Sequence, residues 1–439
     1  MQIGPLWRRN RSRNEPSGAL IEAVVGEDVP VRHPQDRIDR CIPRITAPLE
    51  RGSDMKTAFA GIVALGALAL ASCAPTITDN PGATAPPLQT GAATRGASEE
   101  FAPRKVAINF SGDLLWHDTL WAAAEIDGGG TMDFEPQLAA LADYVSQADL
   151  AICHSEVPFA KEGGPYGNYP MFQAPPEIAE ALAKIGWDLC TTASNHALDA
   201  GFEGLVRTIE QHEAVGILTA GTYASKADSE TPVIFTTDDG VKIGVVSLTY
   251  GTNGIPLPQG KPWSVSLLDA DAGLAQAQRA KDAGADIVVA HMHAGTEYDS
   301  NPNAEQIEFA EAMTASDAVD LVIGQHAHVV QPITRINDKW VAYGAGNLIA
   351  DSGPAQPHTF EGFLATFTFT EQEDGSFTSD AAEFAPTFIT KFSSAAPTRV
   401  YIISDALEEG LGDAAALNAS AARTRKTVLS LGAEGLTER

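Results

Sequence analysis

Apolar and polar positions follow two alternating patterns from residue 105 onward. Short apolar runs predict buried strands at residues 106–110, 150–153 and 188–192. Apolar side chains at three- to four-residue spacing predict amphipathic helices at residues 135–147, 175–184 and 201–215. Strands that alternate with helices in this order predict a parallel sheet with right-handed crossovers.

The second half of the chain repeats the strand pattern and then becomes rich in strands. Further strands are predicted at residues 242–249, 286–291, 320–323, 340–343, 362–370 and 376–384. No internal repeat is visible. The pattern therefore predicts one continuous α/β domain in which two packed sheets are flanked by helices.

Residues 55–73 have the features of a lipoprotein signal peptide. Lys56 supplies a positive charge, residues 58–71 are apolar, and small residues precede Cys73. The apolar run is short for a membrane span, which favours a cleaved signal over a transmembrane helix. The Pro/Thr/Gly-rich stretch that follows argues against a buried core helix. We therefore expect an exported protein that is anchored to the cell envelope by lipid on Cys73.

The segments on either side of this signal define the expected domain boundaries. Residues 74–103 lack hydrophobic periodicity, as a flexible linker does. Because a signal peptide works at a nascent N-terminus, translation is expected to begin at Met55, and residues 1–54 are interpreted as an over-extended start. The folded domain is expected over residues 104–400, followed by a C-terminal helical extension over residues 401–439.

Composition and charge narrow the class of partner. Of the 439 residues, 44% are hydrophobic, as in ordinary globular proteins, and the formal net charge is -28. An acidic surface repels phosphates, so we expect no nucleic-acid partner. Cys153 and Cys190 fall near the ends of predicted strands, and the sequence leaves open whether they are buried thiols or a disulfide.

Polar clusters follow nearly every predicted strand, where the loops of an open α/β sheet converge on ligands. The clusters are Gly112-Asp113, Ser155-Glu156 and residues 194–199, 291–295 and 324–328. Together they offer carboxylates, an amide oxygen and imidazoles, a ligand set that suits Zn, Mn or Fe better than Ca. The alternative is a collection of helix caps and core histidines, since a lone Asp after a strand is more often a cap than a ligand.

Four motifs within and after these clusters carry a family resemblance. They are N-H-A-L-D-A-G at residues 195–201, H-A-G-T-E-Y at 293–298, G-Q-H-A-H-V-V-Q-P at 324–332 and Y-G-A-G-N at 343–347. In order and spacing they resemble the CapA family, capsule-synthesis proteins linked to poly-γ-glutamate that are similar to calcineurin-type metallophosphatases. The resemblance covers residues 106–351 and implies a metallophosphatase-like four-layer α/β/β/α sandwich with two packed mixed sheets.

The resemblance also implies a metal site with one or two divalent transition-metal ions, Mn, Zn or Fe. The implied ligands are Asp113, Glu156, Asn195, His293, His326 and His328. Asp113 and His328 would hold one metal, Glu156 would lie between two, and the other three would hold the second. Two close cations would lower the pKa of a bridging water and share the charge on an attacked phosphorus.

Two further residues receive catalytic roles from the resemblance. His196 would be a general acid or a donor to phosphate, and Asp199 would either orient its neighbours or cap the helix that follows. The chain departs from the metallophosphatase pattern at Leu115, where a histidine is usual, and at Glu156, where an aspartate is usual. The first metal site is therefore expected to lack one nitrogen ligand.

Three functions follow from these features. The CapA resemblance implies a role in the synthesis, export or anchoring of an extracellular polymer, with the polymer or its synthesis machinery as partner. The ligand set favours an active metal-dependent hydrolase of phosphoesters or amides. The third is a non-catalytic module that binds a carboxylate-rich chain.

Overall fold

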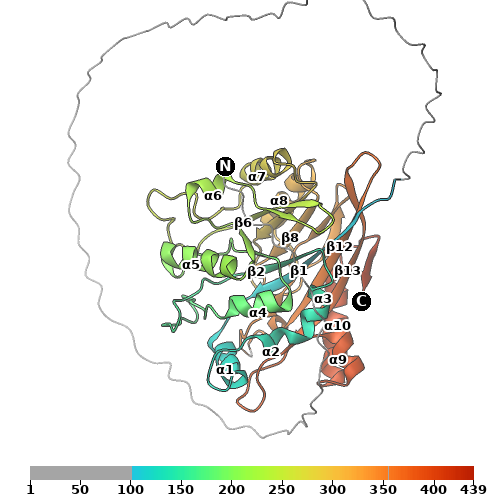
Figure 1. The fold of residues 1–439 in the computed structure, drawn as a ribbon. Coiled ribbons are helices and arrows are strands. Elements are labelled where there is room, and N and C mark those ends of the chain that lie inside the picture. Colours follow the sequence, from blue (N-terminus) through green and yellow to red (C-terminus); the bar gives the residue numbers. More distant parts are fainter. Residues whose placement is uncertain (1–100, 354) are drawn as a thin grey trace, which may run out of the picture. The chain divides into compact units, whose positions relative to one another are not determined.

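Two mixed β-sheets lie face to face in the computed structural model, which describes residues 101–353 and 355–439 (Figure 1). The expectations for residues 1–54, for the signal peptide with Cys73, and for most of the linker at residues 74–103 lie outside the described residues. No helix among the residues described combines the length and the apolar character needed to cross a membrane.

The larger sheet contains nine strands in the described part of the chain. They are β1 (Lys105–Leu114), β2 (Leu150–Ser155), β3 (Leu189–Thr191), β4 (Leu218–Ala220), β11 (Asn347–Ile349), β12 (Glu361–Glu371), β13 (Phe377–Ile389), β14 (Val400–Ile402) and β15 (Leu436–Glu438). Their order is β14-β13-β12-β1-β2-β3-β4, with β11 paired to β1 and β15 paired to β13. Strands β1 to β4 run parallel, whereas β12 is antiparallel to both β1 and β13.

The smaller sheet contains six strands among the described residues, in the order β5-β6-β7-β8-β10-β9. They are β5 (Ile234–Thr236), β6 (Lys242–Thr249), β7 (Ile287–His293), β8 (Leu321–Gln325), β9 (Ile333–Ile336) and β10 (Lys339–Ala342). Its central strands β6, β7, β8 and β10 are parallel, and both edge strands are antiparallel to their neighbours. Both sheets are therefore mixed, as expected.

Helices surround the two sheets (Figure 1). They are α1 (Asp118–Asp127), α2 (Glu135–Leu138), α3 (Ala142–Val145), α4 (Ile178–Ile185), α5 (Gly201–Ala214), α6 (Lys226–Glu230), α7 (Ala270–Asp282), α8 (Ala304–Thr314), α9 (Ile403–Glu409) and α10 (Ala414–Val428), with 3-10 turns η1 (Ala139–Leu141) and η2 (Pro357–Phe360). Helices α1 to α4 share a core with the larger sheet, and α7 and α8 share one with the smaller sheet. The four-layer sandwich is confirmed.

Alternation of side chains along the strands produces these layers. In β2, Leu150 and Ile152 join the core between the two sheets, whereas Ala151 and Cys153 face the helices. The central strands are apolar on both faces because both faces are covered, as in other layered α/β proteins. Strands covered on both faces appear in the sequence as continuous apolar runs, and such runs were the signal that predicted them.

The predicted helix at residues 135–147 is wrong as a single element. The chain instead forms α2, the 3-10 turn η1 and α3 in succession. Leu138, Leu141 and Val145 are still buried on one side, so the apolar spacing was interpreted correctly. The 3-10 turn tightens the backbone between the two short helices. Packing against the sheet therefore overrides the local preference for one continuous helix.

A disulfide and a C-terminal strand in the larger sheet go beyond what the sequence predicted. Cys153 and Cys190 are directly opposite each other on β2 and β3 and form a disulfide. Residues 401–439 hold α9 and α10, as a helical extension would, but they also include β15, which pairs in parallel with β13. The end of the chain is thus part of the sheet.

Candidate metal centre

The polar clusters meet where the carboxyl ends of parallel strands from both sheets converge. Asp113 lies near the end of β1, inside the strand and not after it, and His293 is the last residue of β7. Glu156 follows β2, Asn195 follows β3, and His326 and His328 follow β8. All six predicted ligands are buried, and His328 is the most exposed of them at 5%.

Asp113 is positioned by a close approach of two backbones. A Cβ atom at Gly112 would lie 2.1 Å from the carbonyl oxygen of Gly346, so only glycine fits there. The Asp113 N–H donates to that same oxygen over 2.9 Å. The pairing of β1 with β2 and with β11 shifts register around Asp113, an irregularity that re-aims side chains next to functional sites.

One group of potential ligands consists of Asp113, Glu156 and His328. His328 Nδ1 lies 3.2 Å from Asp113 Oδ2 and 3.0 Å from the side-chain oxygen of Asn347. Since both neighbours accept hydrogen bonds, Nδ1 carries a proton. That leaves His328 Nε2, 3.7 Å from Glu156 Oε1, to bind a cation.

A second group shares Asp113 and adds His154 and His293. His154 Nε2 lies 3.9 Å from Asp113 Oδ1, and its Nδ1 lies 2.9 Å from the Thr191 hydroxyl. The expected gap at Leu115 is therefore filled from β2, because His154 brings a nitrogen to Asp113 from the neighbouring strand. His154 is thus a candidate nitrogen ligand that the sequence analysis did not include.

His293 connects this group to Asn195 and Glu156. Its Nε2 lies 2.7 Å from the Asn195 side-chain oxygen and 3.9 Å from Glu156 Oε1. The Asn195 amide nitrogen donates to Asn253 over 3.2 Å, which keeps the oxygen directed at His293. An amide oxygen and an imidazole nitrogen so placed could serve one cation together.

The loop after β8 holds two histidines in strained backbone. The φ angles are 99° at His326 and 57° at His328, a region that non-glycine residues rarely adopt. Strain of this kind is concentrated at functional sites. The His326 ring lies 4.8 Å from that of His293, centroid to centroid, so the loop directs both of its imidazoles toward the shared centre.

His196 and Asp199 form a pair beside the ligands. His196 Nδ1 lies 2.7 Å from Asp199 Oδ2, which also accepts the Phe172 N–H over 2.8 Å. Asp199 does not cap the next helix, whose N-cap residue is Ala200 without a side-chain bond. Of the two roles open for Asp199, this contact with the His196 ring favours the orienting one.

Burial keeps most of these imidazoles neutral. It lowers the pKa of His154 and His293 well below the usual range and that of His326 to about 3, with neighbouring imidazoles adding to the effect. Burial would also lower the pKa of His328, but the carboxylates of Glu156 and Asp113 outweigh it and raise that pKa to about 10. His154, His293 and His326 are therefore in the neutral form that binds metals, whereas His328 would have to release a proton from Nε2 when a cation binds.

The centre also contains buried polar atoms without hydrogen-bond partners among the described residues. They are Asp113 Oδ1, both Glu156 oxygens, His154 Nε2, His293 Nδ1 and His326 Nδ1. Burial raises the pKa of Glu156 well above its usual range, the adjacent Asp113 adding to the shift. Unpaired buried carboxylates are strongly unfavourable, and a divalent cation would neutralise them. The donor set therefore fits a divalent transition metal.

His154 is the main functional residue that the sequence interpretation missed. It stands two positions before Glu156, so in extended backbone the two side chains lie on one face. That spacing was a usable signal. Asn347, which contacts His328, stood in the Y-G-A-G-N motif without an assigned role.

Comparison with known proteins agrees with this geometry. Residues 107–352 match the family described as Bacterial capsule synthesis protein PGA_cap. This chain belongs to that family. The PGA_cap match contains every residue of the centre named above, from Asp113 to Asn347.

Relatives with assigned names share part of their length with this PGA_cap chain. The PGA biosynthesis protein CapA of Bacillus subtilis (strain 168) is 30% identical over 178 residues, 40% of this chain and 46% of that protein. The probable polyglutamine synthesis accessory protein Rv0574c of Mycobacterium tuberculosis (strain ATCC 25618 / H37Rv) is 24% identical over 214 residues, 46% of this chain and 56% of that protein. The chain thus matches about half the length of these relatives.

Solved structures show a more distant likeness. The calcineurin-like phosphoesterase YfkN from Bacillus subtilis aligns with a TM-score of 0.41 at 16% identity, covering 70% of this chain and 97% of that one. A putative 5'-nucleotidase from Staphylococcus aureus aligns with a TM-score of 0.39 at 18% identity, covering 64% and 54%. At these identities and TM-scores the solved structures say nothing about the chemistry of this centre.

Proposed function

We propose that this chain acts outside the cytoplasmic membrane, anchored by lipid on Cys73, in the synthesis, export or anchoring of an extracellular polymer of the poly-γ-glutamate type. We further propose that its centre holds one or two divalent transition metals and hydrolyses an amide or phosphoester bond. Membership of the capsule-synthesis family supports the first part. The signal-like sequence at residues 55–73 supports the export and the anchor.

One observation carries the chemical part of the proposal. Two buried carboxylates, Asp113 and Glu156, have unpartnered oxygens among the described residues and are surrounded by imidazoles that burial keeps neutral. His328 lies 3.2 Å from Asp113 and 3.7 Å from Glu156, but one imidazole does not satisfy two buried carboxylates. Their remaining oxygens are costly to bury without a partner, which a bound cation would supply. A bound divalent cation would supply Lewis-acid activation of the scissile group and of a water.

The chain's own residues account for the remaining steps. Asp113, His154, Glu156, Asn195, His293, His326 and His328 would hold the cations. Asp199 holds His196 by Nδ1 over 2.7 Å, so His196 Nε2 is the atom placed to give a proton to a leaving oxygen or nitrogen. This oriented pair favours hydrolysis over a module that only binds.

The strongly acidic chain must still attract an anionic polymer under this proposal. The formal net charge of -28 repels a carboxylate-rich chain at long range. Bound cations are the largest local charges in such a site and would reverse the sign of the field near it. Carboxylates would therefore be attracted to the centre despite the acidic charge of the whole chain.

Elemental analysis of the purified protein tests the metal part directly. We expect about one or two transition-metal ions per chain, lost in Asp113→Asn and retained in the control Glu373→Gln, whose residue lies outside the centre. Metal-loaded protein should then release product from γ-glutamyl amides or phosphoesters. Absence of any metal after reconstitution with Zn, Mn and Fe would sink the hydrolytic mechanism and leave only the role in polymer assembly.

A further inference from the structure

A cavity of about 400 Å³ lies on the helix-covered face of the larger sheet. It is bounded by residues 144–148 and by strands β1, β12, β13 and β15, and no residue of the metal centre lines it. Its size is within the range of small-molecule sites. The cavity is therefore a candidate for a ligand of its own.

Strand register places a row of polar side chains across its floor. Asn109 of β1 pairs with Thr366 of β12, Thr366 pairs with Glu383 of β13, and Glu383 pairs with Thr437 of β15. Directly paired residues in neighbouring strands point to the same face of a sheet. Thr366, Glu383 and Thr437 thus line the cavity in one row, and the buried Asn109 continues the row beneath it.

The adjacent row explains why there is space above this line. Ala107, Thr368 and Ala381 pair with one another in the same register and all line the cavity. Their side chains are small and leave space above the sheet. A polar floor beneath an unfilled volume is an arrangement that favours a polar ligand over an apolar one.

A chain of hydrogen bonds is directed into the cavity. The Asn109 amide donates to the Thr366 hydroxyl over 3.4 Å, and Thr366 donates to the Tyr144 hydroxyl over 3.1 Å. Burial, aided by Glu383, raises the pKa of Tyr144 to about 12, so its hydroxyl stays protonated. Since the Tyr144 oxygen is already an acceptor, its proton is available to a ligand acceptor.

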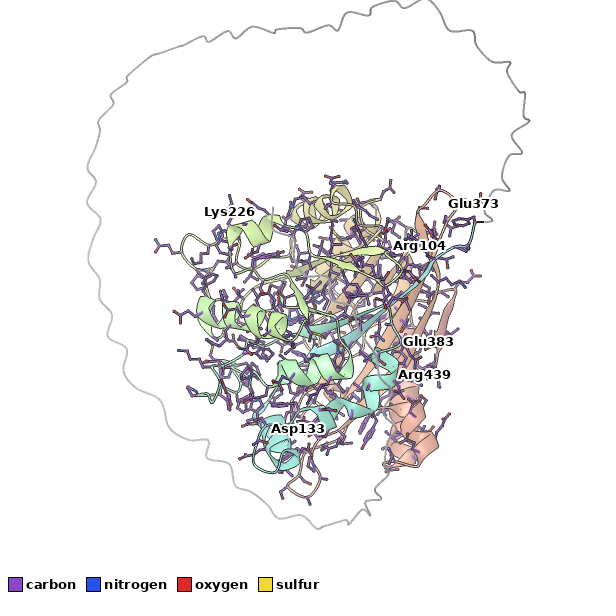
Figure 2. The ribbon with its side chains drawn as sticks, viewed as in Figure 1. Arg104, Asp133, Lys226, Glu373, Glu383 and Arg439 are labelled. Carbon is purple, nitrogen blue, oxygen red and sulfur yellow. A yellow bond between two sulfur atoms is a disulfide. The ribbon has the colours of Figure 1, made fainter. Side chains whose placement is uncertain are left out.

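Opposite charges also line this volume. Glu383 forms no ion pair with any described residue. The Arg439 guanidinium lies over the Tyr144 ring, 5.2 Å from its centroid, and is held by Asp405 at 3.2 Å. Figure 2 shows Glu383 and Arg439 near each other at the edge of the larger sheet. An anchored cation and an unpaired carboxylate thus border the same cavity.

We propose that this cavity binds a small zwitterion, an α-amino acid or the amino end of a γ-linked chain, with its ammonium group at Glu383 and its carboxylate at Arg439 and Tyr144. The amino end of a γ-linked glutamyl chain keeps a free ammonium and α-carboxylate on one carbon, as the free amino acid does. The site needs no metal and stands without the proposed hydrolysis. Only the choice of glutamyl probes rests on the proposed function.

Calorimetric titration of the full chain tests the site with three probes: L-glutamate, γ-L-glutamyl-L-glutamate and glutarate, which lacks the ammonium group. We expect at least one zwitterion to bind with a Kd on the order of 1 mM or tighter, and glutarate to bind at least about tenfold more weakly. Glu383→Gln should weaken zwitterion binding about tenfold and Tyr144→Phe about fivefold, since each loses a charged or charge-assisted hydrogen bond.

Two controls separate this site from others. Glu373→Gln, at an exposed turn between β12 and β13, and Asp113→Asn, at the metal centre, should both leave zwitterion binding unchanged. Binding of the free amino acid alone, or of the dipeptide alone, identifies the source of the zwitterion. Binding that is lost in Asp113→Asn, is equal for glutarate, is insensitive to Glu383→Gln, or is absent for all three probes overturns the proposal.

Discussion

A buried carboxylate without a hydrogen-bond partner, such as Glu156, is unstable until a proton or a cation neutralises it. Burial raises its pKa well above the usual range, so Glu156 holds a proton more tightly than an exposed glutamate does. Cation binding would displace that proton. The same side chain thus couples the stability of the domain to metal loading.

This coupling predicts a thermal signature. Chelation should lower the Tm of the metal-loaded protein by roughly 5–10 °C, because a cation present well above its Kd stabilises only the folded state. Glu156→Gln should lose metal and show little response to chelator, and its Tm should be close to that of metal-free wild type. Differential scanning calorimetry with and without chelator measures this. An equal Tm drop in Glu156→Gln and wild type would contradict it.

The His196 and Asp199 pair makes a separate prediction about catalysis. His196→Ala and Asp199→Asn should each reduce turnover by about 10²- to 10⁴-fold while metal content stays unchanged, because a proton donor is removed in one and disoriented in the other. The double variant should be no worse than His196→Ala, since Asp199 acts through His196. Steady-state rates with matched metal analysis measure this, and additive losses would refute the pairing.

Sequence patterns predicted individual elements with uneven success. The strand at residues 242–249 was predicted to the residue, because it is a long apolar run buried on both faces. The three-residue strands β4 and β11 were not predicted, because such short strands depend on pairing with neighbours and give little local signal. The ligand cluster was predictable because loops after parallel strands converge. His154 was missed because it lies inside a strand, where a histidine looks like a core residue.

At the scale of elements, the contribution of the disulfide between β2 and β3 to the free energy of unfolding can be measured. Cys153 precedes His154, and Cys190 precedes Thr191, which contacts the His154 ring over 2.9 Å. Its sequence separation of 37 residues corresponds to a stabilisation of about 2–4 kcal/mol through the unfolded chain. The double variant Cys153→Ala and Cys190→Ala should lose that amount in urea unfolding under oxidising conditions. Under reducing conditions the variant and wild type should converge, and a persistent gap would assign the loss to packing instead.

At the scale of the whole molecule, the proposed lipid anchor on Cys73 makes a prediction about where the protein is found in cells. We expect Cys73→Ser to move the protein from the membrane fraction to the soluble fraction of cells, because the lipid would be the attachment. Thr78→Ser, in the expected linker beyond the signal segment, keeps both the cysteine and the signal peptide and is the matched control. Fractionation with immunodetection measures this, and an unchanged membrane association in Cys73→Ser would argue against the lipid anchor.

The centre draws its side chains from both sheets, and this arrangement constrains when a cation can be acquired. Asp113 and Glu156 belong to the larger sheet, whereas His293, His326 and His328 belong to the smaller one. Neither sheet alone presents the full set, so loading must follow the packing of the two sheets. The compartment in which the chain finishes folding would therefore choose the metal, through the ions available there, as much as the ligands themselves do.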